Sequence, residues 1–344
     1  MFKKTTILLI TLLFAFILCG AASAASAASV KTNHATVANV KVGAVSYDQD
    51  HASIDGVRVV LEQTNSTGNS AIYYKNVATG SSSKILNSKQ NQYDPHISGT
   101  NIVWVQNSSG IFSIYYKNLA TGKYGKILNS SYNQFYPAIS GNMVVWTQNS
   151  TSGIFSIYYK NLSTGAHGIV YKSTQFQTEP SISGSRVVWS QLNTSTGHFA
   201  VYERNFATGF IGKLYSASSD QLNPVISGTR VVWMQITGNK FVVYQKNLVS
   251  GAVGKIYTST NLQINPAISD QRIVWTQISG QSSVIYLRNM LTGYLAPIVS
   301  LSKNPVDNAA ISGVRVVWTQ YDSNGHTTIY IKNLSTGYIG KLTS

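Results

Sequence analysis

The chain has 344 residues, of which 43% are hydrophobic and 11% charged; its 26 Lys and Arg against 11 Asp and Glu give a formal net charge of +15 at pH 7. This hydrophobic content is typical of a protein with a packed core. The positive charge favours anionic partners, such as acidic glycans or a membrane surface, and carries no information about the fold. No further feature of the sequence points to nucleic acid, which is not an expected partner.

Residues 1–24 have the pattern of a secretory signal peptide. Lys3 and Lys4 form the positive region, the apolar run "ILLITLLFAFIL" follows, and Ala-Ser-Ala at 22–24 offers a cleavage site. The run is too short for a bilayer, which needs about 20 residues. We therefore expect an exported protein, extracellular or at the cell surface or envelope, with no transmembrane anchor after signal removal. Residues 25–37 are expected to form a flexible leader.

The cysteine content excludes several kinds of chemistry. Cys19 is the only cysteine, and it lies inside the predicted signal peptide. The exported chain would then have no disulfide, no thiol nucleophile and no cysteine metal ligand. Leu18 precedes Cys19, where a lipoprotein signal has a small residue, so lipidation is not expected.

A repeat of 42 to 44 residues runs through the rest of the chain. A period of this length, with several short strands per copy, is typical of β-propeller blades. The sequence therefore predicts an all-β, seven-bladed β-propeller over residues 38–344, with four antiparallel strands in each blade. The repeat is anchored on the isoleucine of "ISG" and its variants, at Ile54, Ile97, Ile139, Ile182, Ile226, Ile268 and Ile311.

The second copy shows the four predicted strands. Runs rich in Val, Ile, Tyr and Trp, bounded by Gly, Asn, Ser and Thr, are typical of strands. Such runs occur at 94–98, 101–106, 112–118 and 125–128. No stretch after the signal peptide has a helical period, so no helix is expected there.

Three residue types recur at fixed places in the copies. A glycine ends each "TG" turn, which predicts a positive φ. A tryptophan lies seven residues after six of the anchors, with Leu61 in the first copy, and is expected to pack between blades. A glutamine two residues later is expected to satisfy a nearby backbone group. The tryptophans are Trp104, Trp146, Trp189, Trp233, Trp275 and Trp318, and the glutamines are Gln63, Gln106, Gln148, Gln191, Gln235, Gln277 and Gln320.

The third predicted strand of each copy ends in Tyr-x-[Lys/Arg]-Asn, and its Asn is expected to bond to the backbone of the following turn. Before the first anchor, "NVKV" at 39–42 lies one repeat before the outer strand of the first copy, and 340–344 would form the outer strand of the seventh. We expect residues 38–44 to help latch the ring.

The pattern "ISG…VVW.Q…IYYKNL.TG…GKI" resembles the repeats of TolB-like β-propellers, in particular those of exported archaeal and bacterial surface proteins. The resemblance covers about residues 40–344 and implies a propeller that binds or scaffolds. Members often carry Trp-Ser-Pro-Asp-Gly at the first turn and Asp at the end of the third strand. This chain has "ISG" and Asn there, which weakens any inference of a TolB-type partner.

A ring of polar or aromatic residues lies three positions before the anchors. We expect these residues at the entry of the innermost strands, around the channel mouth, where they either line a water-filled channel or bind a ligand. In an enzyme, Asp94 and Glu179 would be the acid and base, with His51 and Tyr136 nearby. The ring consists of His51, Asp94, Tyr136, Glu179, Asn223, Asn265 and Asn308.

A second ring is basic. Seven equivalent cations near the ends of the third strands are expected to form a positive annulus on one face, which either holds an anionic polymer or keeps the face soluble. They are Lys75, Lys117, Lys160, Arg204, Lys246, Arg288 and Lys332.

No nucleophile elbow, zinc-protease motif or dinucleotide-binding glycine pattern occurs, and the histidines lack metal-ligand spacing. No cofactor or metal is expected, and we expect a monomer. The sequence favours a non-catalytic exported propeller that binds an anionic glycan, a wall polymer or a surface protein. A polysaccharide lyase or hydrolase with its site at the channel mouth, and a purely structural envelope component, remain alternatives.

Overall fold

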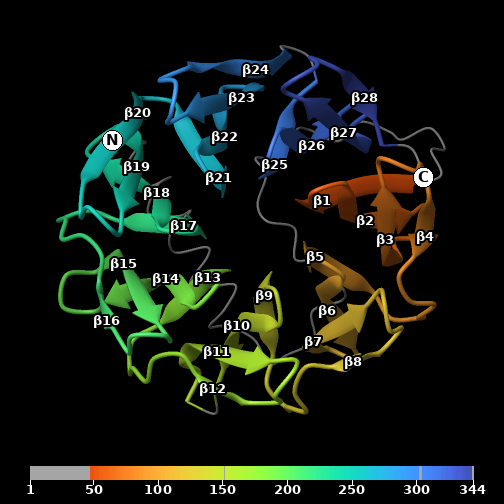
Figure 1. Ribbon diagram of the computed structural model, residues 1–344, viewed down its shortest axis with the longest axis horizontal. Helices are drawn as coiled ribbons and strands as arrows, with labels where there is room; N and C mark the ends of the chain where they lie inside the picture. The colour runs from red at the N-terminus through yellow and green to blue at the C-terminus, as the bar shows by residue number, and fades with distance from the viewer. Residues whose placement is uncertain (1–46, 151, 302–303, 343–344) are drawn as a thin grey trace. The chain divides into compact units, whose positions relative to one another are not determined.

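The computed structural model describes residues 47–150, 152–301 and 304–342. The chain divides into two units, 1–39 and 40–344, and all described residues belong to the second. The predicted signal peptide, the leader and the proposed latch at 38–44 lie outside the described residues. Within the second unit, seven four-stranded antiparallel sheets surround a central axis (Figure 1). The prediction of an all-β, seven-bladed propeller is confirmed.

Each blade is built from four consecutive strands, and its first strand lies innermost (Figure 1). Blade 1 is β1–β4, blade 2 is β5–β8, and so on to blade 7, which is β25–β28. The innermost strands are β1 (Tyr47–Asp55), β5 (Gln92–Ser98), β9 (Gln134–Ser140), β13 (Gln177–Ser183), β17 (Gln221–Ser227), β21 (Leu262–Ser269) and β25 (Val306–Ser312). The second strands are β2 (Arg58–Asn65), β6 (Asn101–Ser108), β10 (Met143–Asn149), β14 (Arg186–Asn193), β18 (Arg230–Thr237), β22 (Arg272–Ser279) and β26 (Arg315–Tyr321).

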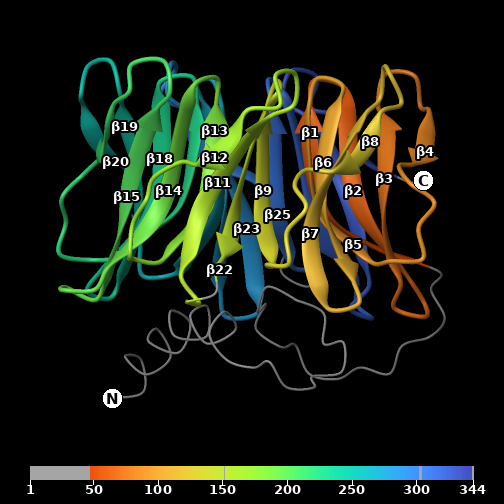
Figure 2. The same cartoon turned by 90° about the horizontal axis from the view of Figure 1, so that it is seen from below.

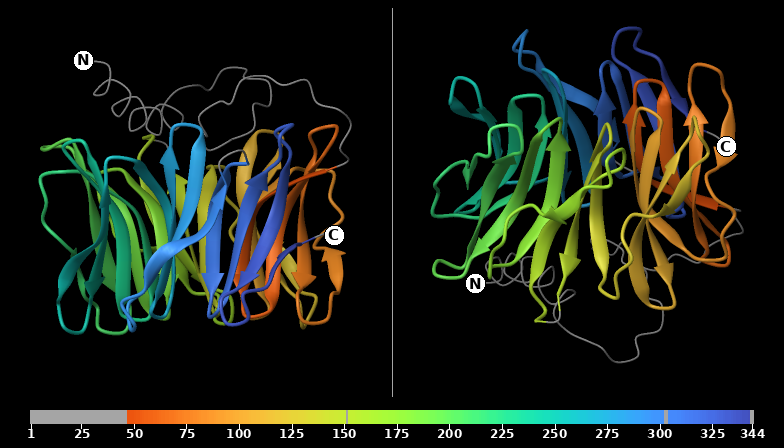
Figure 3. Two further views of the ribbon diagram at one scale, coloured as in Figure 1. Left: turned by 90° about the horizontal axis from the view of Figure 1, so that it is seen from above. Right: turned by 60° about the horizontal axis from the view of Figure 1, so that its bottom comes forward.

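The third and fourth strands complete each blade toward the rim, and the strands run along the depth of the ring (Figures 2 and 3). The third strands are β3 (Ser70–Asn76), β7 (Ile111–Asn118), β11 (Phe155–Asn161), β15 (His198–Asn205), β19 (Lys240–Asn247), β23 (Ser282–Asn289) and β27 (Thr327–Asn333). The outer strands are β4 (Ser82–Lys84), β8 (Tyr124–Lys126), β12 (His167–Ile169), β16 (Ile211–Lys213), β20 (Val253–Ser259), β24 (Leu295–Leu301) and β28 (Ile339–Lys341). The turns between first and second strands, and between third and fourth strands, share one end of the ring, here called the TG face.

The predicted strands of the second copy are present, with shifted ends. Its first strand begins at Gln92, two residues before the predicted start, because pairing continues on both sides of a register shift between Tyr93 and His96. Its outer strand is Tyr124–Lys126, whereas 125–128 was predicted. Backbone bonding nevertheless extends past this strand, since Ile127 N donates to Ile114 O at 2.8 Å.

The tryptophans lie between blades, as predicted. Trp104 is fully buried in a cluster that includes Ile72 and Ile85 of blade 1. Trp146 likewise packs against Ile114 of blade 2. Each indole therefore faces the preceding blade, and large apolar surface is removed from water at each such seam.

The second-strand glutamines were predicted to bond to a backbone group, and this prediction is wrong. Gln106 Oε1 accepts a hydrogen bond from the side chain of Gln92, at 3.1 Å, and no backbone group. It is the first-strand glutamine that reaches the backbone, because Gln92 Oε1 accepts from Ile72 N of the preceding blade at 3.1 Å. The same arrangement recurs in blades 3 and 4, for example in the bonds of Gln134 with Gln148 and with Ile114 N. A buried relay of two amides thus joins neighbouring sheets.

The turn predictions are confirmed. Asn118 Oδ1 accepts from the backbone N–H groups of Ala120 and Thr121, both at 2.9 Å, and Gly122 has a φ of 72°. All seven equivalent asparagines accept a backbone hydrogen bond two residues on, and all seven glycines have positive φ. A β-carbon at these glycines would be strained by the left-handed backbone.

Candidate functional site

The ring predicted at the channel mouth lies inside the innermost strands rather than at their entry. Its seven residues all have positive φ, between 48° and 55°, and each sits at a register shift between first and second strand. Left-handed backbone is tolerated by Asn, Asp and His but is unfavourable for Tyr136 and Glu179. The strands therefore hold these side chains at one repeated kink in the channel wall.

Ring residues of neighbouring blades bond to one another. Asn223 donates from its backbone N and from Nδ2 to the carboxylate of Glu179, at 3.0 and 2.9 Å. Asn265 Nδ2 donates to Asn308 Oδ1 at 3.0 Å, and Asn308 Nδ2 donates to Asp50 Oδ1 at 3.0 Å. Several members are thus partly satisfied within the ring.

Charged residues concentrate where blades 7, 1 and 2 meet the channel. We call Asp50, His51, Glu62, Asp94 and Asp307 the channel cluster. His51 Nδ1 lies 3.5 Å from Asp50 Oδ2 and 3.8 Å from Glu62 Oε2. Four of the 11 acidic residues of a strongly basic chain therefore surround one histidine.

The charged residues of the channel cluster shift one another's pKa values. Burial alone would lower the pKa of His51, but the charges of Asp50, Glu62, Asp94 and Asp307 outweigh it and raise that pKa to about 9. Burial raises the pKa of Glu62 to about 7, although the charge of His51 opposes the shift. At neutral pH the cluster thus holds a protonated His51 and a Glu62 that is about half protonated.

The two aspartates titrate in the other direction. Burial would raise the pKa of Asp50, but His51 and hydrogen bonds from Thr319 and Asn308 lower it overall. His96 and His51 likewise outweigh burial and lower the pKa of Asp94. Both carboxylates are therefore ionised at neutral pH.

Sequence reasoning found His51 and Asp94 and missed Asp50, Glu62 and Asp307. The signal was available in the repeat itself, because functional residues break the symmetry that packing residues keep. At the Glu62 position, the other copies carry Val105, Thr147, Ser190, Met234, Thr276 and Thr319. At the position shared by Asp50 and Asp307, they carry Tyr93, Phe135, Thr178, Leu222 and Ile264.

The other predicted catalytic residues do not form one acid–base pair. Asp94 Oδ1 lies 3.3 Å from His96 Nε2, in blade 2, whereas Glu179 belongs to blade 4 and is held by Asn223 and Ser190. Burial raises the pKa of Glu179. Burial, and then the charges of Glu179 and Asp94, raise the pKa of Tyr136. Asp94 and Glu179 therefore have different hydrogen-bond partners, and Tyr136 in blade 3 is influenced by both.

The basic ring does not form the expected open annulus. Lys117 Nζ donates to Ile85 O of the preceding blade at 2.6 Å, and Lys160 makes the same bond to Ile127 O at 2.6 Å. Arg204, Lys246 and Lys332 also donate to carbonyls in or just after the outer strand of the preceding blade, and Arg288 donates to a turn in its own blade. Six of the seven cations are thus bonded to carbonyls, and all seven are half-buried. The ring clamps the blades together.

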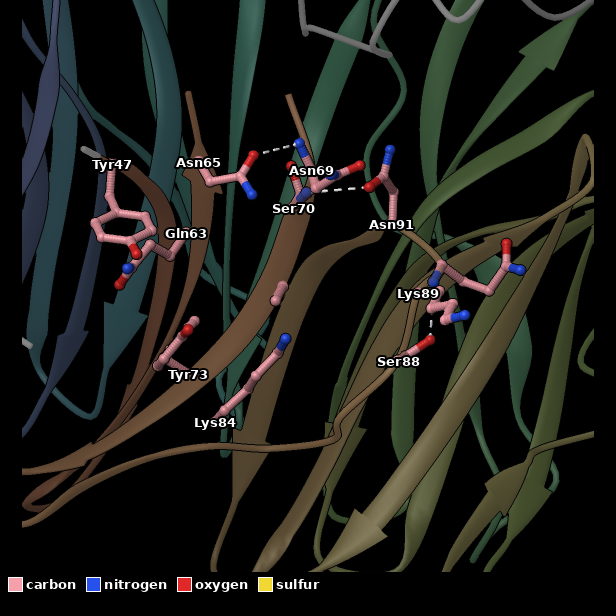
Figure 4. Close-up of a pocket in the computed structure, with 12 residues that line it drawn as sticks. Tyr47, Gln63, Asn65, Asn69, Ser70, Tyr73, Lys84, Ser88, Lys89 and Asn91 are labelled. Carbon is pink, nitrogen blue, oxygen red and sulfur yellow. Dashed lines mark hydrogen bonds between the residues drawn. The ribbon is translucent and has the colours of Figure 1, made fainter. Parts of the chain in front are cut away.

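A polar hollow of about 220 Å³ lies on blade 1, where Leu61 replaces the repeated tryptophan (Figure 4). Tyr47, Tyr73 and Lys84 line it together with Gln63. Gln63 is 4% exposed, and its Oε1 is buried without a partner, whereas Gln148 Oε1 in blade 3 accepts from Trp146 Nε1 at 3.2 Å. The missing indole therefore leaves an unsatisfied acceptor in this blade.

Within residues 47–150, 152–301 and 304–342, no group of three or more His, Cys, Asp or Glu side chains is placed to hold a metal ion. The same part of the chain contains no helix of the length and hydrophobicity that crossing a membrane requires.

No protein-family model and no curated protein sequence matches the chain. Solved structures do match its fold. A prolyl endopeptidase aligns with a TM-score of 0.69 at 13% identity, over 86% of this chain and 49% of that one. An oligogalacturonate lyase in complex with manganese aligns with a TM-score of 0.65 at 10% identity, over 83% and 89% of the chains. TolB from Acinetobacter baumannii aligns with a TM-score of 0.52 at 17% identity, over 77% and 65%.

These similarities concern the fold. The chain spans about half the length of the peptidases it matches. At identities of 10–17%, structural neighbours of peptidase, lyase and TolB type share an architecture, and one architecture hosts many activities. The chain has the TolB-like seven-bladed propeller fold, and enzymes are among the proteins that share it.

Proposed function

We propose that this protein is a non-catalytic, exported binding scaffold of the cell surface or envelope, and that its ligand engages the channel cluster. The observation that carries this proposal is the asymmetry of the ring: four carboxylates surround His51 on one side of the channel, whereas Glu179 is the one acidic residue at the corresponding positions of blades 3 to 6. Burying charge is unfavourable unless it is compensated, so a cluster that packing does not require points to a ligand.

The charge of the cluster indicates the chemistry of the ligand group. Asp50 and Asp94 are ionised at neutral pH, Glu62 is about half ionised, and His51 supplies one positive charge. The local charge is therefore negative in a basic protein. A group that carries hydrogen-bond donors and positive charge, such as an amine on a peptide or an amino sugar, complements this region.

Binding arrays test the proposal. The full chain is screened against arrays of peptides and of neutral, acidic and amino-bearing glycans, and the hits are remeasured with Asp50→Asn and Glu62→Gln. We expect these variants to weaken an amine-bearing ligand at least tenfold. Asp270→Asn removes the same charge at an exposed turn of the TG face and is the matched control, expected to bind as the parent does. A folded protein that binds nothing on either array would favour the structural envelope component instead.

A specific observation also supports the enzyme alternative. Glu62, with its pKa raised to about 7, lies 3.8 Å from His51, and a carboxylic acid protonated near neutral pH can serve as a general acid. A glycan lyase or hydrolase would use this pair. An activity screen on acidic polysaccharides separates the two functions: turnover that Glu62→Gln abolishes, with binding retained, would establish the enzyme and contradict the scaffold.

A further inference from the structure

Arginines begin the second strand of five blades, and two of them have protein partners. Arg186 in blade 4 pairs with Glu203. Arg230 in blade 5 donates to Gln245 Oε1 at 2.6 Å and to Gln271 Oε1, across the seam with blade 6, at 3.1 Å. In these blades the guanidinium is therefore satisfied by the third strand or by the next blade.

Blade 6 has lost both partners. Leu287 occupies the third-strand position that Glu203 and Gln245 occupy in blades 4 and 5, as the strand registers show. Val314 occupies the position of Gln271 in the following blade. No described side chain or backbone group bonds to the guanidinium of Arg272. A guanidinium has five N–H donors, so all of them remain available here.

The next blade repeats the arrangement. Arg315 begins the second strand of blade 7, and Ile331 stands where Glu203 and Gln245 stand in the earlier blades. Arg315 also has no partner among the described residues. Within the described residues, blades 6 and 7 therefore present unpaired guanidinium groups at equivalent places on the TG face, as blade 1 does with Arg58.

Arg272 borders a hollow of about 420 Å³ between blades 6 and 7. Lys332 lies in the same lining, and its Nζ donates to Ile298 O at 2.9 Å, which leaves two of its three protons available. The remaining wall includes Leu287, Leu334 and Tyr294. The hollow thus combines two cations with an apolar and aromatic wall.

Exposed tyrosines lie on the turns between the third and fourth strands of both blades. Tyr294, which lines the hollow, is 52% exposed, and Tyr338 at the equivalent turn of blade 7 is 63% exposed. A tyrosine offers an apolar face together with a polar end. Cation and ring therefore recur together in two adjacent blades, which suits a ligand that itself repeats.

We propose that the TG face of blades 6 and 7 binds an acidic polysaccharide through its uronate groups. A carboxylate accepts paired hydrogen bonds from the planar guanidinium of Arg272, and Lys332 adds a second charge. The sugar ring packs on Tyr294. The next acidic unit of the chain meets Arg315 and Tyr338 in blade 7. This site uses none of the residues of the channel cluster.

The experiment measures binding of a short oligogalacturonate to the full chain at low ionic strength. Arg272→Ala removes the cation, and Leu287→Glu rebuilds inside blade 6 the pair that Arg186 makes with Glu203. We expect each variant to weaken binding at least tenfold. Leu287→Glu should do so without unfolding the blade, because its carboxylate gains a partner. Arg230→Ala removes an equal charge from a partnered position and should change affinity less than twofold.

Three results would overturn the proposal: undiminished binding by a folded Leu287→Glu variant, equal binding of an oligomer whose carboxyl groups have been reduced to alcohols, or no binding of the uronate oligomer by the parent. A peptide that binds through a free C-terminal carboxylate, when the uronate oligomer does not, would assign the hollow to a protein partner. Glu62→Gln leaves this binding intact, so the channel proposal and this one fail separately.

Discussion

The backbone N–H of Gly56 in blade 1 donates a hydrogen bond of 2.9 Å to Oγ of Ser312 in blade 7, although 256 residues separate them in the sequence. The same bond joins every other pair of adjacent blades. In each pair the acceptor is the side chain of the last residue of a first strand, a serine or Asp55. The donor is the backbone N–H of the residue that follows the first strand of the next blade. The remaining six pairs are Gly99–Asp55, Gly141–Ser98, Gly184–Ser140, Gly228–Ser183, Asp270–Ser227 and Gly313–Ser269. A closed circle of hydrogen bonds thus runs around the TG face.

The bond of Ser312 differs from the other six because it joins the first and the last blade of the chain. Blades 1 and 7 lie in separate sheets of consecutive strands, so among the described residues no strand is exchanged between them. Gln49 Oε1, which accepts from Ile329 N at 3.3 Å, and Leu342, buried beside Leu61, also belong to this seam. Side-chain contacts therefore hold together blades that are far apart in the sequence.

Replacing Ser312 by alanine should loosen this seam. A hydrogen bond of this kind contributes about 1 kcal/mol to stability. We expect Ser312→Ala to speed amide hydrogen exchange in β1–β3 and β25–β27, because local opening there is not limited by a short chain connection. The control is Ser98→Ala, which removes the same bond between blades 2 and 3. Equal exchange patterns in the two variants would contradict the special role of the seam.

Replacing Gln134 by leucine should destabilise the ring. Gln134 is fully buried, and its loss leaves the backbone N–H of Ile114 without an acceptor. An unsatisfied buried donor costs about 1–3 kcal/mol. Urea denaturation should show this loss, whereas the exposed Gln90→Leu should stay within about 0.5 kcal/mol of the parent. A Gln134→Leu variant as stable as the parent would show that the amide relay is dispensable.

Lys160 tests whether the basic ring is structural. Lys160→Met keeps the apolar stem but removes the bond to Ile127 O, and we expect a loss of about 1–3 kcal/mol in the free energy of unfolding. The exposed Lys123→Met removes the same charge and should be close to neutral. If both variants instead weaken binding of an anionic polymer equally and leave stability unchanged, the ring is a binding surface and the clamp interpretation is wrong.

Glu62 should make the protein less stable as the pH rises. Its pKa is raised from 4.5 to about 7 in the folded state, so the folded chain retains a proton that the unfolded chain releases. The stability from this group is complete below pH 4.5 and is lost as the pH rises through 7. Glu62→Gln should therefore gain stability relative to the parent between pH 4.5 and 8, by at least about 1.4 kcal/mol, the equivalent of one pKa unit.

Thermal denaturation of both proteins across this range measures the effect, and the exposed Asp270→Asn provides the control. His51, whose pKa is raised to about 9, supplies a second and later loss, complete only above that pH. If the stability difference between the parent and Glu62→Gln does not change with pH, Glu62 titrates as an ordinary exposed acid. The claim that burial in the channel cluster raises its pKa would then be wrong.

The repeat predicted much of the fold and part of the site. Seven copies of one sequence repeat were enough to place Trp104 between blades and to assign Asn118 and Gly122 to a turn. Such roles depend on the local sequence pattern and on the residues that the copies share. The partner of Gln106 and the bonds of Lys117 could not be predicted, since the second contact of each lies on another strand or in another blade. The left-handed backbone at Tyr136 could not be predicted either, because tyrosine has no preference for a positive φ.

The sequence by itself determined the seven blades, the four strands of each and the two rings of seven equivalent residues, because periodicity of two along each strand and of about 43 between copies is a property of the chain alone. Only the tertiary structure decided what those rings do. Lys160 becomes a clamp because it meets a carbonyl of the preceding blade. Arg272 is left unpaired because the described residues of blades 6 and 7 offer its guanidinium no acceptor, and Glu62 meets His51 on the neighbouring strand of its own blade. The role of each charged side chain therefore depends on the partners that folding brings to it, which the repeat pattern alone does not specify.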